Sequence, residues 1–280
     1  APPRTSGLFT TDFTRHTVPY AEVLSGGPSK DGIPAIDEPR FVSPDAASGW
    51  LGDREPVVYI EINGDRRIYP IQVLMWHEIV NDIVGGVPVV VTFCPLCNTA
   101  IAYRRDFDGR VLDFGTTGRL RYSNLIMYDR QTETWWQQGL GNAIAGVYAG
   151  RCLDPVPASI IPFEDYRRSV PNGQVLSRET GYDRDYGRNP YVGYDNIDTD
   201  RPFLYRGPDT DGRLAPMTRV VAIDLNDDPA AYPYPTLADE RVANDRVGDV
   251  PIVVFWQEGT ASSLDATTVA GGEDVGAVTA

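Results

Sequence analysis

The sequence predicts an α+β fold that is mostly β, with two pseudo-equivalent halves from an internal duplication and few short helices. Residues 55–93 align without a gap with residues 218–256, each matching the residue 163 positions later, as Tyr69 matches Tyr232. The apolar runs have the length of strands. The 27 glycines and 23 prolines are spread along the chain, as expected for short strands joined by tight turns. Repeat, run length and turn residues therefore agree on this fold class.

Each repeat predicts the same order of elements. Residues 57–63 and 220–226 read as strands followed by a polar turn. Pro70 and Pro233 fit the first turn of a helix, which we expect to run to about Asn81 and Asn244 and to stop near the following glycine. The continuous apolar runs 87–93 and 250–256 predict buried strands.

The region between the repeats predicts further short elements. Residues 99–115 read as a hairpin with Asp108-Gly109 at its turn, and 123–138 as two strands. Residues 161–170 read as a short helix, and the Tyr-, Gly- and Asp-rich stretch 179–202 as irregular. We expect an N-terminal segment (1–54) packing on the core, a first repeat (55–195) and a second, degenerate repeat (196–280). The second repeat stops before a counterpart of the hairpin and of the Trp-rich strands, so we expect it to be truncated.

Composition excludes several classes of protein. The chain carries 25 Lys and Arg against 39 Asp and Glu, a net charge of −14, which argues against nucleic-acid or anionic-membrane partners. No apolar run approaches the ~20 residues of a membrane helix, so we expect no transmembrane segment. We expect no signal peptide within the opening residues APPRTSG. Three cysteines do not make a disulfide scaffold.

The stretch VTFCPLCNTA (91–100) carries two of the three cysteines, and the repeat serves as its internal control. Cys94 aligns with Gln257 and His77 with Glu240, whereas the Tyr-Pro, Asn-Asp and Gly-x-Val-Pro framework is kept in both repeats. A cysteine that only fills space would be replaced by a small residue rather than by glutamine. We therefore expect Cys94, Cys97 and His77 to form a functional site.

Three interpretations of this site stay open. Thiolates and an imidazole suit copper or zinc, with Cys152, Met127, a carboxylate or water as a weak or fourth ligand. A CxxC pair also suits metal-free thiol–disulfide exchange, in which the first cysteine is normally exposed at a helix N-terminus. The residues after Cys97 read as a strand, which weakens that interpretation. The third interpretation is a non-catalytic binding module with structural cysteines.

Other candidates carry weaker signals. His16 lies in a segment expected to be peripheral. Asp129, Arg130 and Glu133 could serve as acid–base groups, although a salt bridge in a strand–turn–strand explains the spacing equally well. Alternation along a strand predicts one of Trp135 and Trp136 in the core and the other lining a groove. The Tyr-rich stretch 182–194 reads as a packed loop that could contact a ligand.

The motifs WHEIVND (76–82) and CPLC (94–97) resemble those of the DUF3179 domain family, over most of residues 55–265. The resemblance implies an extracytoplasmic location and singles out His77, Cys94 and Cys97; it implies no established reaction. We therefore predict an extracytoplasmic protein with one copper held by these three residues. It would act in copper handling or copper-dependent redox chemistry, with a redox or copper-transfer partner. Whether it is an enzyme is left open.

Overall fold

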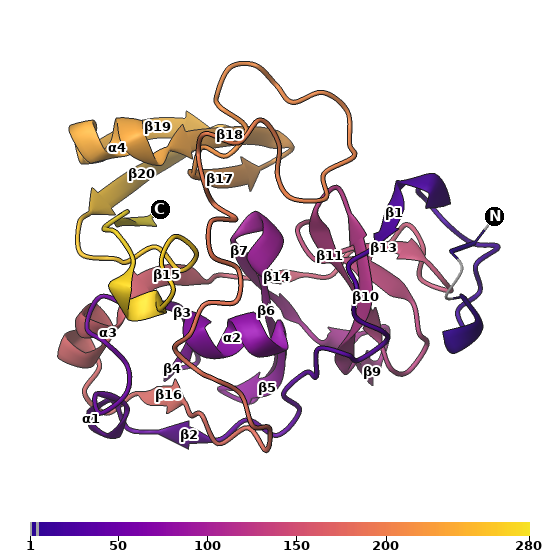
Figure 1. Cartoon of the computed structure of the whole chain (residues 1–280), viewed down its shortest axis with the longest axis horizontal. Coiled ribbons are helices and arrows are strands. Elements are labelled where there is room, and N and C mark those ends of the chain that lie inside the picture. The colour runs from indigo at the N-terminus through magenta and orange to yellow at the C-terminus, as the bar shows by residue number, and fades with distance from the viewer. Residues whose placement is uncertain (1, 4–5) are drawn as a thin grey trace.

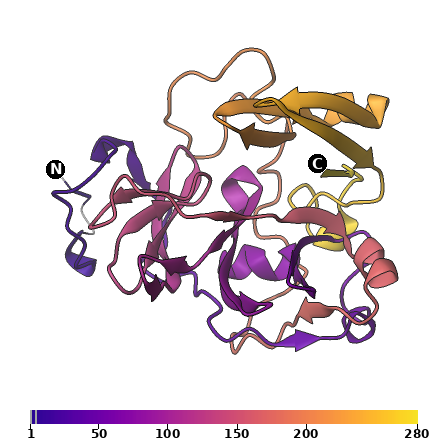
Figure 2. The same ribbon diagram turned by 180° about the vertical axis from the view of Figure 1, so that it is seen from behind.

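The computed structural model describes residues 2–3 and 6–280 and is mostly β, as predicted. Figures 1 and 2 show several short sheets with short helices lying beside them. In the described part of the chain the α-helices are α1 (Pro44–Ala47), α2 (Ile71–His77), α3 (Phe163–Ser169) and α4 (Tyr234–Glu240). None of them is long and apolar enough to span a bilayer. Of the predicted N-terminal segment 1–54, residues 1, 4 and 5 lie outside the described residues.

Two parts of the chain contain the same five elements in the same order. The first unit contains β3 (Pro56–Ile62), β4 (Asp65–Pro70), α2, β5 (Ile79–Val84) and β6 (Val87–Cys94). The second unit contains β17 (Val220–Leu225), β18 (Asp228–Pro233), α4, β19 (Val242–Val247) and β20 (Val250–Gln257). Apart from the first residue of β3, all bounds differ by the 163 positions of the sequence alignment.

The units also share hydrogen bonds. The hydroxyl of Tyr69 donates to Asp82 at 2.6 Å, and that of Tyr232 donates to Asp245 at 2.9 Å. A turn asparagine in each unit donates to the carbonyl of the glycine 22 residues later, at 2.9 Å and 2.7 Å. The matched letters of the two repeats therefore occupy matched structural roles, while their origin by duplication stays a prediction.

The predicted extent of the repeat helix was wrong. The helix ends at His77 rather than near Asn81, because Glu78 takes a left-handed conformation (φ 58°) and its N–H closes onto Leu74. Residues 79–84 then form β5, which pairs with β6 around the Gly85-Gly86 turn. Ile79, Val80, Ile83 and Val84 are β-branched, which favours a strand over a fourth helical turn.

The strands of the first unit belong to two sheets, and a third sheet lies beside them. One has the order β15 (Ser159–Pro162), β3, β4, β16 (Gln174–Leu176) and β2 (Phe41–Val42), and the next has β14 (Pro155–Val156), β7 (Thr99–Arg104), β6 and β5. The third has β1 (Val23–Ser25), β10 (Phe114–Arg121), β11 (Asn124–Asp129), β12 (Trp135–Gln137) and β13 (Asn142–Ala145). Among the described residues, the strands of these three sheets pair antiparallel, except for β16 with β4. The predicted hairpin turn at Asp108-Gly109 joins β8 (Asp106–Phe107) and β9 (Arg110–Val111).

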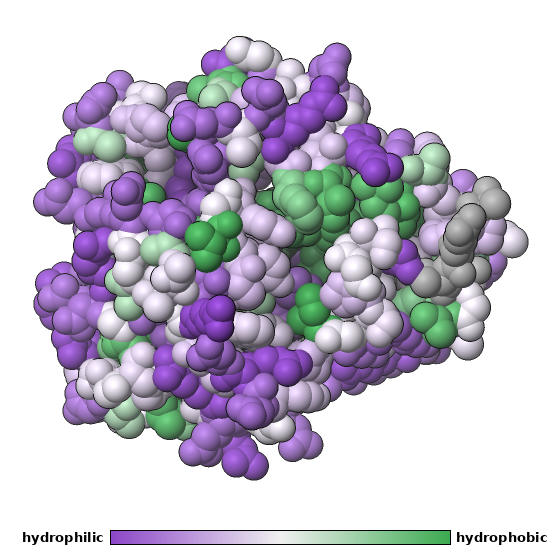
Figure 3. Space-filling view, in the orientation of Figure 1, coloured by the Kyte–Doolittle hydropathy of each residue, from purple (hydrophilic) through white to green (hydrophobic). Residues whose placement is uncertain are grey.

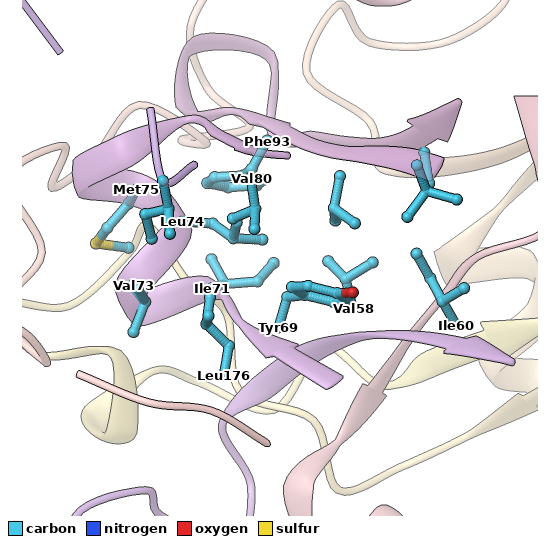
Figure 4. Close-up of a cluster of buried hydrophobic side chains, with 14 of the residues drawn as sticks. Val58, Ile60, Tyr69, Ile71, Val73, Leu74, Met75, Val80, Phe93 and Leu176 are labelled. Carbon is cyan, nitrogen blue, oxygen red and sulfur yellow. The ribbon is translucent and has the colours of Figure 1, made fainter. Parts of the chain in front are cut away.

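The main core lies between α2 and the strands of the first unit. Figure 4 shows Ile71 and Leu74 of α2 among side chains of β3, β5 and β6, including Val58, Val80 and Phe93. All five are at most 1% exposed. Burying each such side chain contributes roughly 1.5–3 kcal/mol. This packing fixes the end of α2 against the end of β6, where Cys94 lies.

Two burial predictions were wrong. Trp135 and Trp136 are both fully buried, because β12 is covered on each face by a separate apolar cluster. In the second unit β20 is not a buried strand; of its residues only Val254 is fully buried. Its sheet, completed by β21 (Ala277–Thr279), packs on one face against α4 and leaves the other face to solvent.

Candidate functional site

The two cysteines lie where β6 turns back into β7. Cys94 is the last residue of β6 and pairs with Thr99 of β7. Pro95 opens the short 3-10 helix η3 (Pro95–Cys97), where its fixed φ is compatible with the turn. Asn98 closes the turn in the left-handed conformation (φ 46°), which asparagine tolerates better than most residues. The CPLCN sequence thus builds a tight turn that brings both thiols to one end of the sheet.

The two thiols differ in exposure and in acidity. Cys94 is 1% exposed and Cys97 is partly exposed, and neither forms a disulfide. Hydrogen bonding from Cys94, reinforced by Asn124, lowers the pKa of Cys97 to about 7. Burial, and then the neighbouring Cys97, raise the pKa of Cys94 well above its ordinary value. The exchange interpretation expected the first cysteine to be exposed, whereas here the second is the accessible one.

The tip of the β10–β11 hairpin forms one wall of the site. The side-chain N–H of Asn124 donates to Cys97 Sγ at 3.2 Å and to Gln138 Oε1 at 2.8 Å, and Asn124 Oδ1 accepts from Gly139 N. The sulfur of Cys94 lies 3.7 Å from the carbonyl oxygen of Ser123. Since Asn124 is held at three points, its donor is preorganised beside Cys97.

Glu78 brings a carboxyl group to the same place. Its carbonyl accepts from Phe93 N at 2.9 Å, which fixes it beside the strand that ends at Cys94. Burial, together with the charge of Cys97, raises the pKa of Glu78 to about 8. Within residues 2–3 and 6–280 its carboxylate makes no hydrogen bond or ion pair. A buried carboxyl without an ion-pair partner is suited to taking up and releasing a proton near pH 7.

His77 is fully buried and both of its ring nitrogens are engaged elsewhere. Nδ1 lies 2.8 Å from the carbonyl of Pro34, and Nε2 lies 2.6 Å from the hydroxyl of Tyr186. Because a carbonyl can only accept, Nδ1 carries the proton and Nε2 accepts from Tyr186. Burial lowers the pKa of His77. The imidazole therefore anchors neighbouring chain segments in this arrangement instead of contacting the cysteines.

The two auxiliary metal-ligand candidates lie in different places. Met127 is fully buried in the apolar cluster that also contains Cys94. Cys152 is exposed, and its thiol donates to Asn142 Oδ1 at 2.8 Å. In the described residues no three His, Cys, Asp or Glu side chains form a group arranged to hold a metal ion.

The remaining candidates have structural roles. His16 is exposed and its Nδ1 lies 3.0 Å from the carbonyl of Val18. Asp129 is buried and accepts from the indole of Trp136 at 2.9 Å. Arg130 pairs with Asp37, and Glu133 pairs with Lys30.

A long irregular segment lies over the site. The cover segment, residues 177–219, joins β16 to β17 and passes beside α2 in Figure 1. It contains the Tyr-rich stretch, which was expected to be a packed loop. Tyr186 reaches His77, the carbonyl of Phe203 accepts from Ser123 Oγ at 2.5 Å, and burial with the nearby Glu78 and Cys94 raises the pKa of Tyr191. Figure 3 shows a hydrophobic hollow on this face, beside the β10–β11 hairpin.

Sequence reasoning missed Glu78, Asn124 and Tyr191. The internal comparison held a signal for the first of them, because the second unit has Arg241 at the position of Glu78. Glutamate in the first unit is matched by arginine in the second, and the preceding residues, His77 and Glu240, also differ. The two units therefore clearly differ at the end of this helix. Asn124 and Tyr191 lie outside the repeat and carried no such signal.

Comparison with known proteins identifies the family of the chain but indicates no reaction or ligand. Residues 30–280 match the family described as "Protein of unknown function (DUF3179)", which covers nearly the whole chain. No curated protein matches the chain, and neither does any solved structure.

Proposed function

Since the chain belongs to the DUF3179 family, for which no function is described, we propose its function from the site itself: Cys94 and Cys97 form a redox dithiol that exchanges with disulfides. The observation that carries this proposal is the contact between a buried thiol and a partly exposed one of low pKa. A thiolate is the attacking species in exchange, and a pKa near the ambient pH is the most effective compromise between its abundance and its nucleophilicity.

Cys97 acts first. Its thiolate attacks a disulfide, so that a bond forms between Cys97 Sγ and one substrate sulfur while the substrate S–S bond breaks. The second substrate sulfur leaves as a thiolate and takes a proton from water. Cys94 then attacks Cys97 Sγ, the Cys94–Cys97 disulfide forms, and the first substrate sulfur leaves as a thiol. Two electrons pass from the dithiol to the substrate disulfide.

Glu78 accepts the proton of Cys94 in the second step. The charge on Cys97 contributes to the raised pKa of Glu78, and the mixed disulfide removes that charge. Loss of that charge lowers the pKa of Glu78, while burial, the main cause of its raised pKa, remains. Glu78 can then release its proton to water and, as a carboxylate, take the proton of Cys94. The carboxyl then passes this proton to the departing substrate sulfur, which leaves as a thiol, and Glu78 regains a proton from water once the disulfide has formed.

The experiment traps the mixed disulfide. A Cys94→Ser variant, made with Cys152→Ser to remove the exposed thiol, is mixed with oxidised glutathione as the probe disulfide. We expect one glutathione per chain, attached to Cys97 by mass spectrometry, whereas the protein that retains Cys94 ends as the internal disulfide. Absence of the adduct, or an adduct on Cys94 when Cys97→Ser is used instead, would refute the exchange mechanism.

Copper binding is a second proposal, favoured by the two adjacent sulfur donors. Cys94 and Cys97 supply soft ligands for copper, with zinc as the alternative metal, and Met127 lies in the same apolar cluster. His77 can join them only by giving up its contact with Tyr186. Elemental analysis of tag-free protein tests this: about one copper per chain, lost in Cys94→Ala and reduced in His77→Ala, supports the predicted set.

Two further predictions are tested alongside. If the cysteines are structural parts of a non-catalytic binding module, the Cys94→Ser, Cys97→Ser double variant would keep full function in cells. The proposed extracytoplasmic location rests on the family resemblance; fractionation of producing cells that finds the protein only with cytoplasmic markers would contradict it.

A further inference from the structure

We propose that the outer face of the β19–β20 hairpin is a docking site for an extended polypeptide strand from another protein. We call this surface the hairpin face; its side chains are those of Val242, Asn244, Val253 and Phe255. Val242 lies opposite Phe255 and Asn244 opposite Val253, so all four side chains emerge on the same side of the sheet. The bound strand would carry an aromatic residue whose peptide group pairs with Asn244.

The first unit shows how such a face is covered. The equivalent residues Ile79, Asn81, Val90 and Thr92 are between 0 and 3% exposed. Strand β10 lies against them, and the ring of Phe114 is buried in the same cluster as Ile79 and Val90. The side chain of Asn81 accepts from Phe114 N at 2.9 Å and donates to Phe114 O at 2.9 Å. One asparagine thus satisfies both polar groups of a single residue of the covering strand.

The hairpin face has the equivalent asparagine and valine residues, but no strand of the described chain lies over it as β10 lies over the first unit. Phe255 is 50% exposed and Val242 is 43% exposed. Asn244 is exposed and, among the described residues, has no side-chain hydrogen-bond partner corresponding to Phe114. The sequence therefore preserves the asparagine and the apolar residues around it where folding does not bury them.

These groups favour a peptide strand as the occupant. The amide of Asn244 offers N–H donors and a carbonyl acceptor, which match the C=O and N–H of one extended residue. The flanking Val242 and Phe255 provide an apolar surface for its side chain. A second copy of this chain is less suitable, because its own strand with this pattern, β10, is already buried against Asn81.

The test uses a peptide of residues 110–118, RVLDFGTTG, which contains Phe114. It is titrated to millimolar concentration into isotope-labelled full-length chain while NMR follows the backbone amides of β19 and β20 and the side-chain amide of Asn244. We expect saturable shifts there. Removing two hydrogen bonds by Asn244→Ala should weaken binding about tenfold or more. Phe255→Lys, and a peptide with alanine in place of Phe114, should abolish the shifts.

Ile83→Glu is the matched control, because Ile83 is 55% exposed on the first unit and lies away from the hairpin face. It should bind the peptide as the parent does. Asn244 and Phe255 are exposed, so both variants should fold, which circular dichroism checks. The proposal is overturned by an absence of shifts, by shifts that Asn244→Ala leaves unchanged, or by shifts confined to the first unit. Self-association lost in Phe255→Lys would also overturn it, since a second copy would then be the occupant.

Discussion

The low pKa of Cys97 is the property on which exchange chemistry depends, and Cys94→Ala tests its cause. The substitution removes the thiol whose hydrogen bond contributes most to lowering that pKa, while Asn124 Nδ2 stays 3.2 Å from the sulfur. A hydrogen bond to a charged group contributes about 1.5–3 kcal/mol. Since 1.36 kcal/mol corresponds to one pKa unit, the pKa of Cys97 should rise from about 7 by roughly one to two units.

The assay is the pH dependence of alkylation of Cys97 by iodoacetamide, followed by mass spectrometry with Cys152→Ser present throughout. The midpoint of the profile is measured, because a thiolate of higher pKa is intrinsically more reactive and a single rate would understate the shift. Cys94→Ser is the matched control, since its hydroxyl still donates and should keep most of the effect. A parent midpoint near 9, or equal midpoints in the parent and Cys94→Ala, would refute the reasoning.

Three further predictions concern the surroundings of the site. Because the pKa of Glu78 is raised to about 8 in the folded chain, its carboxyl lowers stability as pH rises from about 4.5 to 8; Glu78→Gln should remove a loss on the order of 4 kcal/mol, measured by urea unfolding at pH 5 and 8. Identical pH slopes would contradict this. Tyr186→Phe should expose the cover segment to proteases while leaving the alkylation midpoint of Cys97 unchanged, and a midpoint that moves would argue against a purely anchoring role. Gly248→Ala should destabilise the second unit by a few kcal/mol, because φ is 52° and a Cβ would lie 2.0 Å from the carbonyl oxygen of Leu225; an unchanged melting temperature would count against that contact.

The strands of the repeat could be predicted because their signal is local. The residues 57–62 and 87–93 carry strand-length apolar runs bounded by turn residues, and the structure contains β3 and β6 there. The end of α2 could not be predicted in the same way. It depends on Glu78 adopting a positive φ so that residues 79–84 can pair with β6, which is a requirement of the tertiary structure. Helix ends with a positive φ usually carry glycine, and here the position carries glutamate, so the sequence gives no signal.

The site was predicted in part for a similar reason. Cys94 and Cys97 are close in sequence, so a tight turn was enough to bring them together. His77 was expected beside them because the helix was expected to end near β6, but the direction of its side chain is decided by Pro34 and Tyr186, which are distant in sequence. Asn124 reaches Cys97 from a different sheet, and no spacing rule connects the two residues.

The two units together separate what the fold requires from what the site requires. Gly85 and Gly248 are kept because a Cβ at either position would lie about 2 Å from a carbonyl oxygen of the preceding hairpin. Folding makes no such demand at the end of the helix, where Glu78 is replaced by Arg241, or at the end of the strand, where Cys94 is replaced by Gln257. Asn81 and Asn244 are the informative exception. Asn244 matches Asn81 in sequence although it is exposed and lacks the strand that Asn81 binds, which agrees with the proposed contact between the hairpin face and another molecule.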